Sequence, residues 1–483
     1  MGFFPALISW LPFLLIALLQ LFKKKRQAKN ELNHLPPSPP KLPIIGNLHQ
    51  LGPLPHSSIR QLSQKYGPVL LLKLGRIPVV FVSSAEAARQ VMKVNDLASC
   101  SRPPLAGIGK LTYNHLDLGF SPYGDYWRQI RKICVLELFS VKRVKSFRFV
   151  REEEVASLMN SLSQLSCSAT PLNLTSKIFT LTGSIIFRVA FGKCFEESDD
   201  FDRERFYELI HDAETVAARF SAEECFPGFG WILDKLNGHN ERVERVFKAL
   251  DKFFQGVIDY HLKPGRTKQH DDIIDVMLGI EKEQIEQGHV WLTKTHIKAV
   301  LLNIFLGGVD TSALVVNWAM AELCRKPELM KKSTKRSSKH CRKQRKTPML
   351  ISREVMSHFK LNGYNIYPKT MIQINAWAIA RDPKYWENPE EFCPERFIDN
   401  NIDFKGQDFE FLPFGAGRRG CPGIYMGTVT SELLLANLLY CFDWKLPDGM
   451  KEEDVDMEEQ GGHCLTLMKK TPLVLVPIEY IPS

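Results

Sequence analysis

The hydrophobic and polar positions divide the chain into an apolar N-terminal run, a polar linker and a long mixed region. Residues 3–22 form a run of 20 residues without a charge, which is the length that an α-helix needs to cross a bilayer. A basic segment, 23–29, follows directly. Because the charges follow the run and no small-residue cleavage site ends it, we expect an uncleaved signal-anchor with the downstream chain in the cytoplasm. A buried core helix is the alternative.

Residues 23–46 are expected to link this anchor to a folded domain. The stretch 36–46 (PPSPPKLPIIG) is rich in proline, whose fixed φ angle and missing N–H donor favour a stiff, extended segment. No second linker and no internal repeat occurs in residues 47–483, so we expect one large domain there.

Two long apolar-periodic stretches in this domain, 296–319 and 426–442, predict buried helices. The first contains FLGGVDTS, whose adjacent glycines each destabilise a helix interior by about 1 kcal/mol relative to alanine. The glycines thin the helix where another group can approach, and Asp310 and Thr311 add a carboxylate and a hydroxyl beside that opening. A threonine that bonds to its own helix backbone is the simpler interpretation.

The composition is that of a globular protein, because 44% of the 483 residues are hydrophobic and 24% are charged. The 11 cysteines include no CxxC pair, so a disulfide framework and a zinc module are disfavoured and a reducing compartment is expected. The net charge of +9 is concentrated in segments 23–29 and 331–346. The second segment has no interleaved aromatic residues for base stacking, so we expect no nucleic-acid partner.

The strongest chemical motif is PFGAGRRGCPG at 413–423, just before the second predicted helix. It fits the pattern FxxGxRxCxG, with Phe414, Arg419 and Cys421 at the positions that are not glycine. Glycines let the backbone approach a metal-bound thiolate, and the N-terminus of the following helix favours its negative charge. A buried structural cysteine in a glycine turn is the alternative.

Together these motifs resemble those of the cytochrome P450s, which are haem-thiolate monooxygenases, and in particular those of plant microsomal enzymes of the A type. The resemblance covers nearly the whole chain from Pro36 onwards. It implies a mainly α-helical fold with small β-sheets, the cytochrome P450 fold, on a single N-terminal transmembrane helix. It also implies haem b as the cofactor, held by a haem domain of residues 47–483.

The resemblance further implies roles for particular side chains. Cys421 would be the proximal ligand of the haem iron, while Thr311 and Asp310 would steer protons on the oxygen-binding side. Trp127 and Arg131 lie four residues apart and therefore share one helix face. The residues expected to bind the haem are Trp127, Arg131, Arg353, Arg419 and Phe414.

One part of the family pattern is missing. The family has a Glu-x-x-Arg helix before the strand of Arg353, and its charges pair with the arginine of the PERF loop, here Arg396. A literal match at Glu322–Arg325 falls at the end of the distal helix, and we attribute it to coincidence. Residues 331–348 instead form an aberrant segment, with nine Lys and Arg between positions 331 and 346.

We expect the chain to incorporate haem poorly or not at all, because breaking one side of a buried charge network costs about 3–5 kcal/mol. With suitable codons, a one-nucleotide shift of frame turns residues 333–346 into AQKEVRNTVGNKGK, which looks typical of the family at this place. A frameshift or a misdrawn exon is therefore our hypothesis for the aberrant segment.

The implied function is a monooxygenase in which NADPH-cytochrome P450 reductase supplies electrons and one oxygen atom of O₂ enters a small lipophilic plant metabolite. The enzyme would be a single-pass protein of the endoplasmic reticulum membrane, with the catalytic domain facing the cytoplasm. The main alternative is a catalytically inactive membrane-anchored product of a pseudogene or of faulty splicing. Isomerase or dehydratase chemistry is disfavoured by the retained Asp310–Thr311 pair, which oxygen activation needs.

Overall fold

The computed structural model describes residues 34–168, 170–192, 203–218, 220–266, 270–288, 291–335, 348–398, 400–461 and 466–479. The expected signal-anchor at 3–22, the first part of the linker 23–46 and most of the aberrant segment 331–348 lie outside the described residues.

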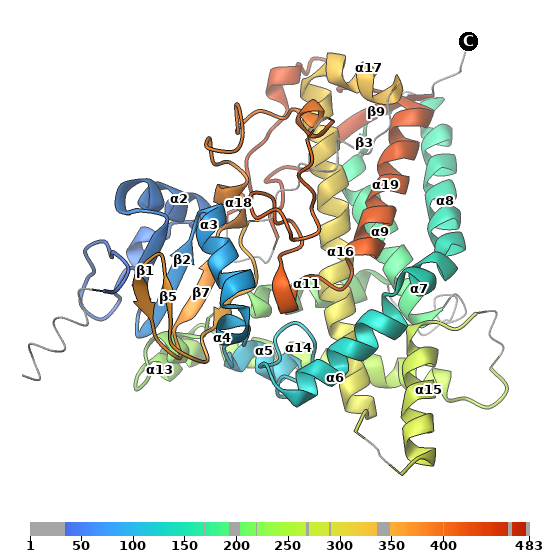
Figure 1. The fold of residues 1–483 in the computed structure, drawn as a ribbon. Helices are drawn as coiled ribbons and strands as arrows, with labels where there is room; N and C mark the ends of the chain where they lie inside the picture. Colours follow the sequence, from blue (N-terminus) through green and yellow to red (C-terminus); the bar gives the residue numbers. More distant parts are fainter. Residues whose placement is uncertain are drawn as a thin grey trace, which may run out of the picture.

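A small sheet stands at one side of the molecule and a larger helical part at the other (Figure 1). The sheet has the strand order β1-β2-β7-β4, with bounds Val69–Leu74, Ile77–Val82, Met371–Ile374 and Arg353–Glu354. Strands β1 and β2 are antiparallel, β2 and β7 are parallel, and β4 returns antiparallel to β7. Arg353 therefore lies on a short strand, as the sequence predicted.

The helical part is built around α16, Lys294–Arg325, which runs through its middle (Figure 1). Helices α9 (Leu174–Phe191) and α19 (Ile424–Cys441) pack against α16, and α8 (Arg148–Ser166) packs against both of those neighbours. The predicted helix 296–319 is thus confirmed, and the helix predicted at 426–442 is found two residues earlier as α19. Aliphatic and aromatic side chains on these helices form the largest buried core.

Among the described residues, three helices, α9, α16 and α19, are long and apolar enough to cross a membrane by length and composition. In α9 and α16, which pack against each other, 72% of the apolar window is buried in the protein core, whereas the value for α19 is 39%.

The remaining elements cover the core and connect its helices. The helices are η1 Leu48–Gln50, α2 Pro55–Tyr66, α3 Ala85–Arg89, η2 Gln90–Val94, α4 Asp96–Ser99, α5 Ala106–Leu111, α6 Asp125–Ile133, η3 Cys134–Leu138, α7 Val141–Ser146, α11 Arg203–Ala217, α12 Ala222–Cys225, α13 Gly230–Leu236, α14 His239–His261, α15 Ile273–Glu286, α17 Pro327–Lys335, α18 Ala376–Ile379, η5 Pro394–Phe397, η6 Gly417–Arg419 and η7 Glu452–Asp454. The other strands are β3 Leu172–Asn173, β5 Phe359–Leu361, β6 Tyr364–Ile366, β8 Phe442–Lys445 and β9 Val474–Glu479. The fold is therefore mainly helical with small sheets, as expected.

Candidate active site

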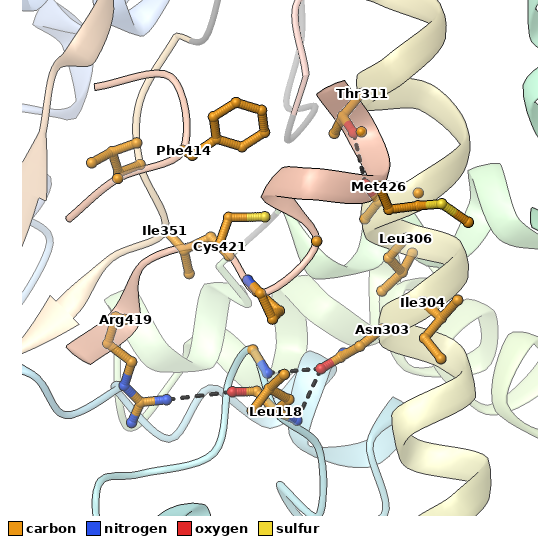
Figure 2. Close-up of a pocket in the computed structure, with 18 of the residues that line it drawn as sticks. Leu118, Asn303, Ile304, Leu306, Thr311, Ile351, Phe414, Arg419, Cys421 and Met426 are labelled. Atoms are coloured by element: carbon orange, nitrogen blue, oxygen red, sulfur yellow. Dashed lines mark hydrogen bonds between the residues drawn. The ribbon is translucent and has the colours of Figure 1, made fainter. Parts of the chain in front are cut away.

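A cavity of about 350 Å³ lies between α16, α6 and the cysteine loop 413–423 (Figure 2). Seven of the eight side chains that the sequence singled out line it. These are Trp127, Arg131, Thr311, Arg353, Phe414, Arg419 and Cys421. Asp310 is the exception, and its surroundings are described below.

The cysteine loop presents Cys421 at the wall of the cavity, on the side that faces α16 (Figure 2). The backbone N–H of Cys421 donates to the carbonyl of Phe414 at 2.9 Å. Gly417 has a φ of +68°, and a Cβ there would collide with the Met92 carbonyl and the Asp96 carboxylate, so only glycine fits. Helix α19 begins directly after the loop, and the partial positive charge of its N-terminus favours a thiolate at this position.

Arg419 and Trp127 form one unit on the cavity wall. The guanidinium of Arg419 lies 4.1 Å from the centre of the Trp127 ring and donates to the Cys100 and Ser121 carbonyls, both at 2.7 Å. The indole N–H of Trp127 donates to the Leu118 carbonyl at 3.0 Å, so it supports the wall rather than pointing into the cavity. Burial lowers the pKa of Arg419 to about 10.

Arg131 and Arg353 both donate hydrogen bonds to the backbone of the cysteine loop. Arg131 donates to the Gly420 carbonyl at 2.6 Å, and Arg353 donates to the Ala416 carbonyl at 3.1 Å. Arg353 is buried and also pairs with the buried Asp96 at 2.8 Å. Burial lowers the pKa of Arg131, while the nearby Cys421 opposes that shift.

Arg102 is a cavity residue that the sequence did not single out. It is 5% exposed, and its guanidinium donates to the carbonyls of Gly119, Ile351 and Ser352 at 2.6–2.9 Å. Burial, together with the positive charges of Arg419 and Arg353, lowers its pKa. Its sequence context, Ser-Arg-Pro in a loop, carries no signal that separates it from a surface arginine.

Four arginines therefore line one cavity, and their charges indicate whether a haem, which carries two carboxylates, fits it. Among the described residues, the hydrogen-bond acceptors of Arg102, Arg131 and Arg419 are backbone carbonyls, which bind a guanidinium without neutralising it. The lowered pKa values report this uncompensated positive charge. A ligand for this cavity should carry negative charge for the arginines and a metal for the Cys421 thiolate. Haem has both, because it carries two propionates and an iron atom.

The opposite wall of the cavity is the middle of α16. Gly307 faces open space, since nothing lies within 4 Å of an added Cβ, whereas Gly308 packs against Ile186. The Thr311 hydroxyl lines the cavity and donates to the Gly307 carbonyl at 2.7 Å. The bond to its own helix backbone, foreseen as the simpler interpretation, is thus present in a residue that also faces the cavity.

The arginine of the PERF loop makes its hydrogen bonds with nearby backbone carbonyls. Arg396 is half-buried and donates to four backbone carbonyls, among them Glu391 at 2.8 Å and Glu387 at 3.0 Å. It lines a second cavity of about 60 Å³ together with Glu322, which lies in the last turns of α16. Among the described residues, none forms a helix between the end of α17 at Lys335 and the start of β4 at Arg353.

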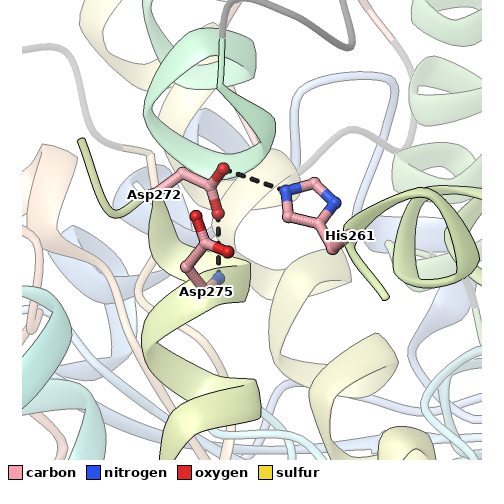
Figure 3. Close-up of side chains that lie close together, drawn as sticks. All are labelled: His261, Asp272 and Asp275. Atoms are coloured by element: carbon pink, nitrogen blue, oxygen red, sulfur yellow. Dashed lines mark hydrogen bonds and ion pairs between the residues drawn. The ribbon is translucent and has the colours of Figure 1, made fainter. Parts of the chain in front are cut away.

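A separate group of side chains has the spacing of metal ligands. His261, Asp272 and Asp275 bring their ligand atoms within 4.8 Å of one another at the junction of α14 and α15 (Figure 3). Arg266, however, pairs with both carboxylates, and His261 Nε2 is hydrogen-bonded to a carboxylate oxygen of Asp272 at 2.9 Å. The Arg266 guanidinium already neutralises the carboxylates, so a metal ion is not needed there. We interpret the group as a structural contact between α14 and α15.

Comparison with known proteins shows that the chain is similar to cytochrome P450s over most of its length. The family model described as Cytochrome P450 matches residues 36–346 and 340–476. Two similar proteins of Arabidopsis thaliana are cytochrome P450 71B37, 49% identical with 99% of each chain covered, and cytochrome P450 71B10, 46% identical with 98% of this chain and 99% of the relative covered. A zebrafish cytochrome P450 structure with abiraterone has a TM-score of 0.70 at 20% identity, covering 88% of this chain and 100% of that chain, which supports the fold alone.

The family match is interrupted at one place. It consists of two segments, which overlap at 340–346 inside the aberrant segment. The alignment with the first of these relatives spans 505 positions, more than the 483 residues of the chain, so that relative contains residues with no counterpart here.

Proposed function

Because this chain belongs to the cytochrome P450 family, as a plant enzyme of the A type with haem b as its cofactor, we propose that it is a membrane-anchored monooxygenase acting on a small lipophilic metabolite. The observation that carries the proposal is the meeting of Cys421, four arginines and the Gly307–Thr311 opening in one cavity. Haem held there by Cys421 supplies the chemistry of oxygen activation.

The residues around the haem have separable roles in this proposal. Arg102, Arg131, Arg353 and Arg419 would neutralise the haem propionates, and the ion pair with Asp96 holds the Arg353 side chain in place. The Trp127 ring lies against the Arg419 guanidinium and stabilises its charge by a cation–π interaction.

The residues on the α16 side handle space and protons. Gly307 leaves room above the haem because it has no side chain. The Thr311 hydroxyl can rotate from the Gly307 carbonyl to donate a hydrogen bond into the cavity. Asp310 is the neighbouring acid that can return a proton to the Thr311 hydroxyl after Thr311 has donated its own.

The lining of the cavity favours an apolar substrate. The side chains on the α16 side and the facing segments are mostly aliphatic or aromatic, and they exclude water from the reacting region. They include Leu118, Phe120, Ile186, Val300, Ile304, Leu306, Ile351 and Leu467. A small lipophilic metabolite fits this lining better than a charged one.

We propose that residues 3–22 anchor the protein in the endoplasmic reticulum membrane, that 23–46 form the linker, and that the domain 47–483 faces the cytoplasm. An exposed apolar surface supports contact with a bilayer. It lies on and just before α13, where Phe229, Trp231, Ile232, Leu233 and Leu236 are 41–79% exposed. The β1–β2 turn joins this surface to the linker, because Gly75 donates to the Ile45 carbonyl and Arg76 donates to the Cys225 carbonyl.

NADPH-cytochrome P450 reductase is the proposed electron donor, since the family works with a redox partner. The alternative of a catalytically inactive product that binds haem poorly finds no support in the comparisons, because membership of the family supports monooxygenase activity and haem b as the cofactor. The cavity also retains the cysteine, the arginines and the threonine that the reaction needs.

The test is reconstitution of the full chain with NADPH-cytochrome P450 reductase in lipid vesicles. A panel of lipophilic plant metabolites is screened first for a change in the haem absorption spectrum and then for NADPH- and O₂-dependent oxygenated products. The proposal predicts at least one product that contains an oxygen atom from ¹⁸O₂ and that a Cys421→Ala variant does not form. Isomerised or dehydrated products without that atom would contradict it.

A further inference from the structure

Two buried carboxyl groups face each other where α11 packs on α16. Glu214 is 2% exposed and Asp310 is 7% exposed. Their side chains are hydrogen-bonded to each other. The second oxygen of Glu214, Oε1, has no hydrogen-bond partner among the described atoms. The pair therefore has almost no solvent and few other donors to stabilise negative charge.

Such a pair must hold a proton. A hydrogen bond between two carboxyl groups needs one of them to be protonated, and two ionised carboxylates in a buried site repel each other strongly. Burial raises the pKa of Glu214 to about 10, and the Asp310 charge adds to that shift. Burial also raises the pKa of Asp310, while its bond to Glu214 and the charge of His211 oppose the rise. At neutral pH the pair therefore holds a proton, and Glu214 carries it.

The position of the pair relates it to the cavity. Asp310 directly precedes Thr311, which lines the cavity, but Asp310 itself is absent from the lining and is directed at α11. Glu214 belongs to α11, which also packs on α5 and α14. The position of Glu214 therefore depends on how these helices pack against one another. The acid that the family pattern assigns to proton delivery is thus held by a partner that the sequence did not reveal.

We propose that Glu214 is a positioning residue for Asp310. By holding a proton that it donates to the Asp310 carboxyl group across the α11–α16 contact, it keeps that side chain oriented behind Thr311 and next to a stored proton. Glu214 acts through Asp310 and does not itself reach the cavity. The proposal rests on the monooxygenase function, since Asp310 serves as a proton source only in that reaction.

The variant Glu214→Gln tests the proposal with little change of shape. The amide can still donate a hydrogen bond to Asp310, but it carries no titratable proton, so the pair is expected to lose the proton that Glu214 holds. The matched control is Glu208→Gln, at an exposed position of the same helix. Both variants are prepared as the full chain in detergent micelles.

The first measurement does not depend on turnover. At pH 8 the infrared spectrum of the wild type should contain a carbonyl stretching band of a buried protonated carboxylic acid that Glu214→Gln lacks and Glu208→Gln retains. If the wild type and Glu214→Gln have the same band, the proton is not held by this pair and the proposal is overturned. This readout remains valid even if no substrate is turned over, so it separates failure of this inference from failure of the proposed function.

The second measurement is the amount of product formed per NADPH consumed, followed from pH 6 to pH 9. The wild type should keep an almost constant ratio, whereas Glu214→Gln should lose about tenfold and lose more as the pH rises, which is less than the ~100-fold typical of losing a general acid itself. A merely structural role would lower activity without altering the pH profile. If Glu214→Gln follows the wild-type profile, Asp310 does not need this partner and the proposal is overturned.

Discussion

Asp96 is predicted to be the electrostatic centre that joins the sheet to the cysteine loop. One of its carboxylate oxygens accepts from Arg353 on β4 at 2.8 Å, and the other accepts from the backbone and side chain of Arg418 at 3.0 and 2.9 Å. Asp96 and Arg353 are 4% and 3% exposed. The change Asp96→Asn keeps the shape, removes the charge and sets an amide donor against a guanidinium donor.

The size of the effect follows from burial. Breaking a buried ion pair by neutralising one partner costs about 3–5 kcal/mol, because the other charge stays buried and uncompensated. The side chain of Arg418 is 47% exposed, so its pair with Asp96 adds little to this cost. A domain with a total stability of about 5–15 kcal/mol would lose a large part of it.

Urea unfolding of the full chain in detergent micelles, followed by tryptophan fluorescence, measures this loss. The matched control is Asp125→Asn, which removes an exposed partner of Arg128 and should leave the unfolding midpoint unchanged. Adding Arg353→Met to Asp96→Asn removes the uncompensated charge and should recover part of the loss. Equal midpoints for Asp96→Asn and Asp125→Asn would refute the reasoning.

Further predictions concern the cavity, the buried acid pair and the membrane surface. Arg102→Met should lower the haem-to-protein ratio of the purified chain, measured by absorbance, while the exposed Arg89→Met should not; equal ratios would remove Arg102 from the haem site. A carboxyl whose pKa is higher in the folded than in the unfolded chain stabilises the fold below its unfolded pKa, and this contribution is lost as the pH rises. For Glu214 the window runs from 4.5 to about 10, so the wild type should lose stability over pH 6–9 by up to about 1.4 kcal/mol per unit, and Glu214→Gln should show a flatter dependence in urea unfolding; parallel curves would argue against a raised pKa. In vesicles with brominated acyl chains, the protein fluorescence should be quenched, and Trp231→Phe should lose much of that quenching; unchanged quenching would place α13 away from the lipid.

Residues close to one another in sequence were predictable, because local spacing determines their geometry. The cysteine loop is one example, since its glycines, Arg419 and Cys421 lie within ten consecutive residues directly before a helix, where their spacing alone indicates a thiolate site. The pair of Trp127 and Arg131 on α6 is another, because residues four apart share a helix face. The long apolar helix α16 was predictable from its period alone.

Partners that are far apart in sequence were not predictable. Arg102 reaches the cavity only because its loop packs against residues 351–352, and Asp96 meets Arg353 from 257 positions away. Glu214 is one of several acids on an amphipathic helix, and only the packing of α11 on α16 separates it from the exposed Glu208. The orientation of Asp310 away from the cavity follows from that same packing.

The aberrant segment 331–348 remains a prediction about the gene. The division of the family match into two segments that overlap at 340–346 agrees with a loss in this segment, and the longer alignment with a relative shows that some of its residues have no counterpart in this chain. Sequencing the transcript tests the hypothesis of a shifted frame or a misdrawn exon. A message that encodes the basic residues in frame by codons incompatible with AQKEVRNTVGNKGK would contradict it.

The central claim is that this chain holds a haem whose iron is bound by the Cys421 thiolate. The most direct measurement is the absorption difference spectrum of the reduced, carbon monoxide-treated full chain, purified in detergent, beside its Cys421→Ala variant. The account predicts the long-wavelength Soret band of thiolate-ligated haem in the wild type and its loss in the variant. A wild-type protein that retains no haem, or one whose band persists without Cys421, would contradict the account.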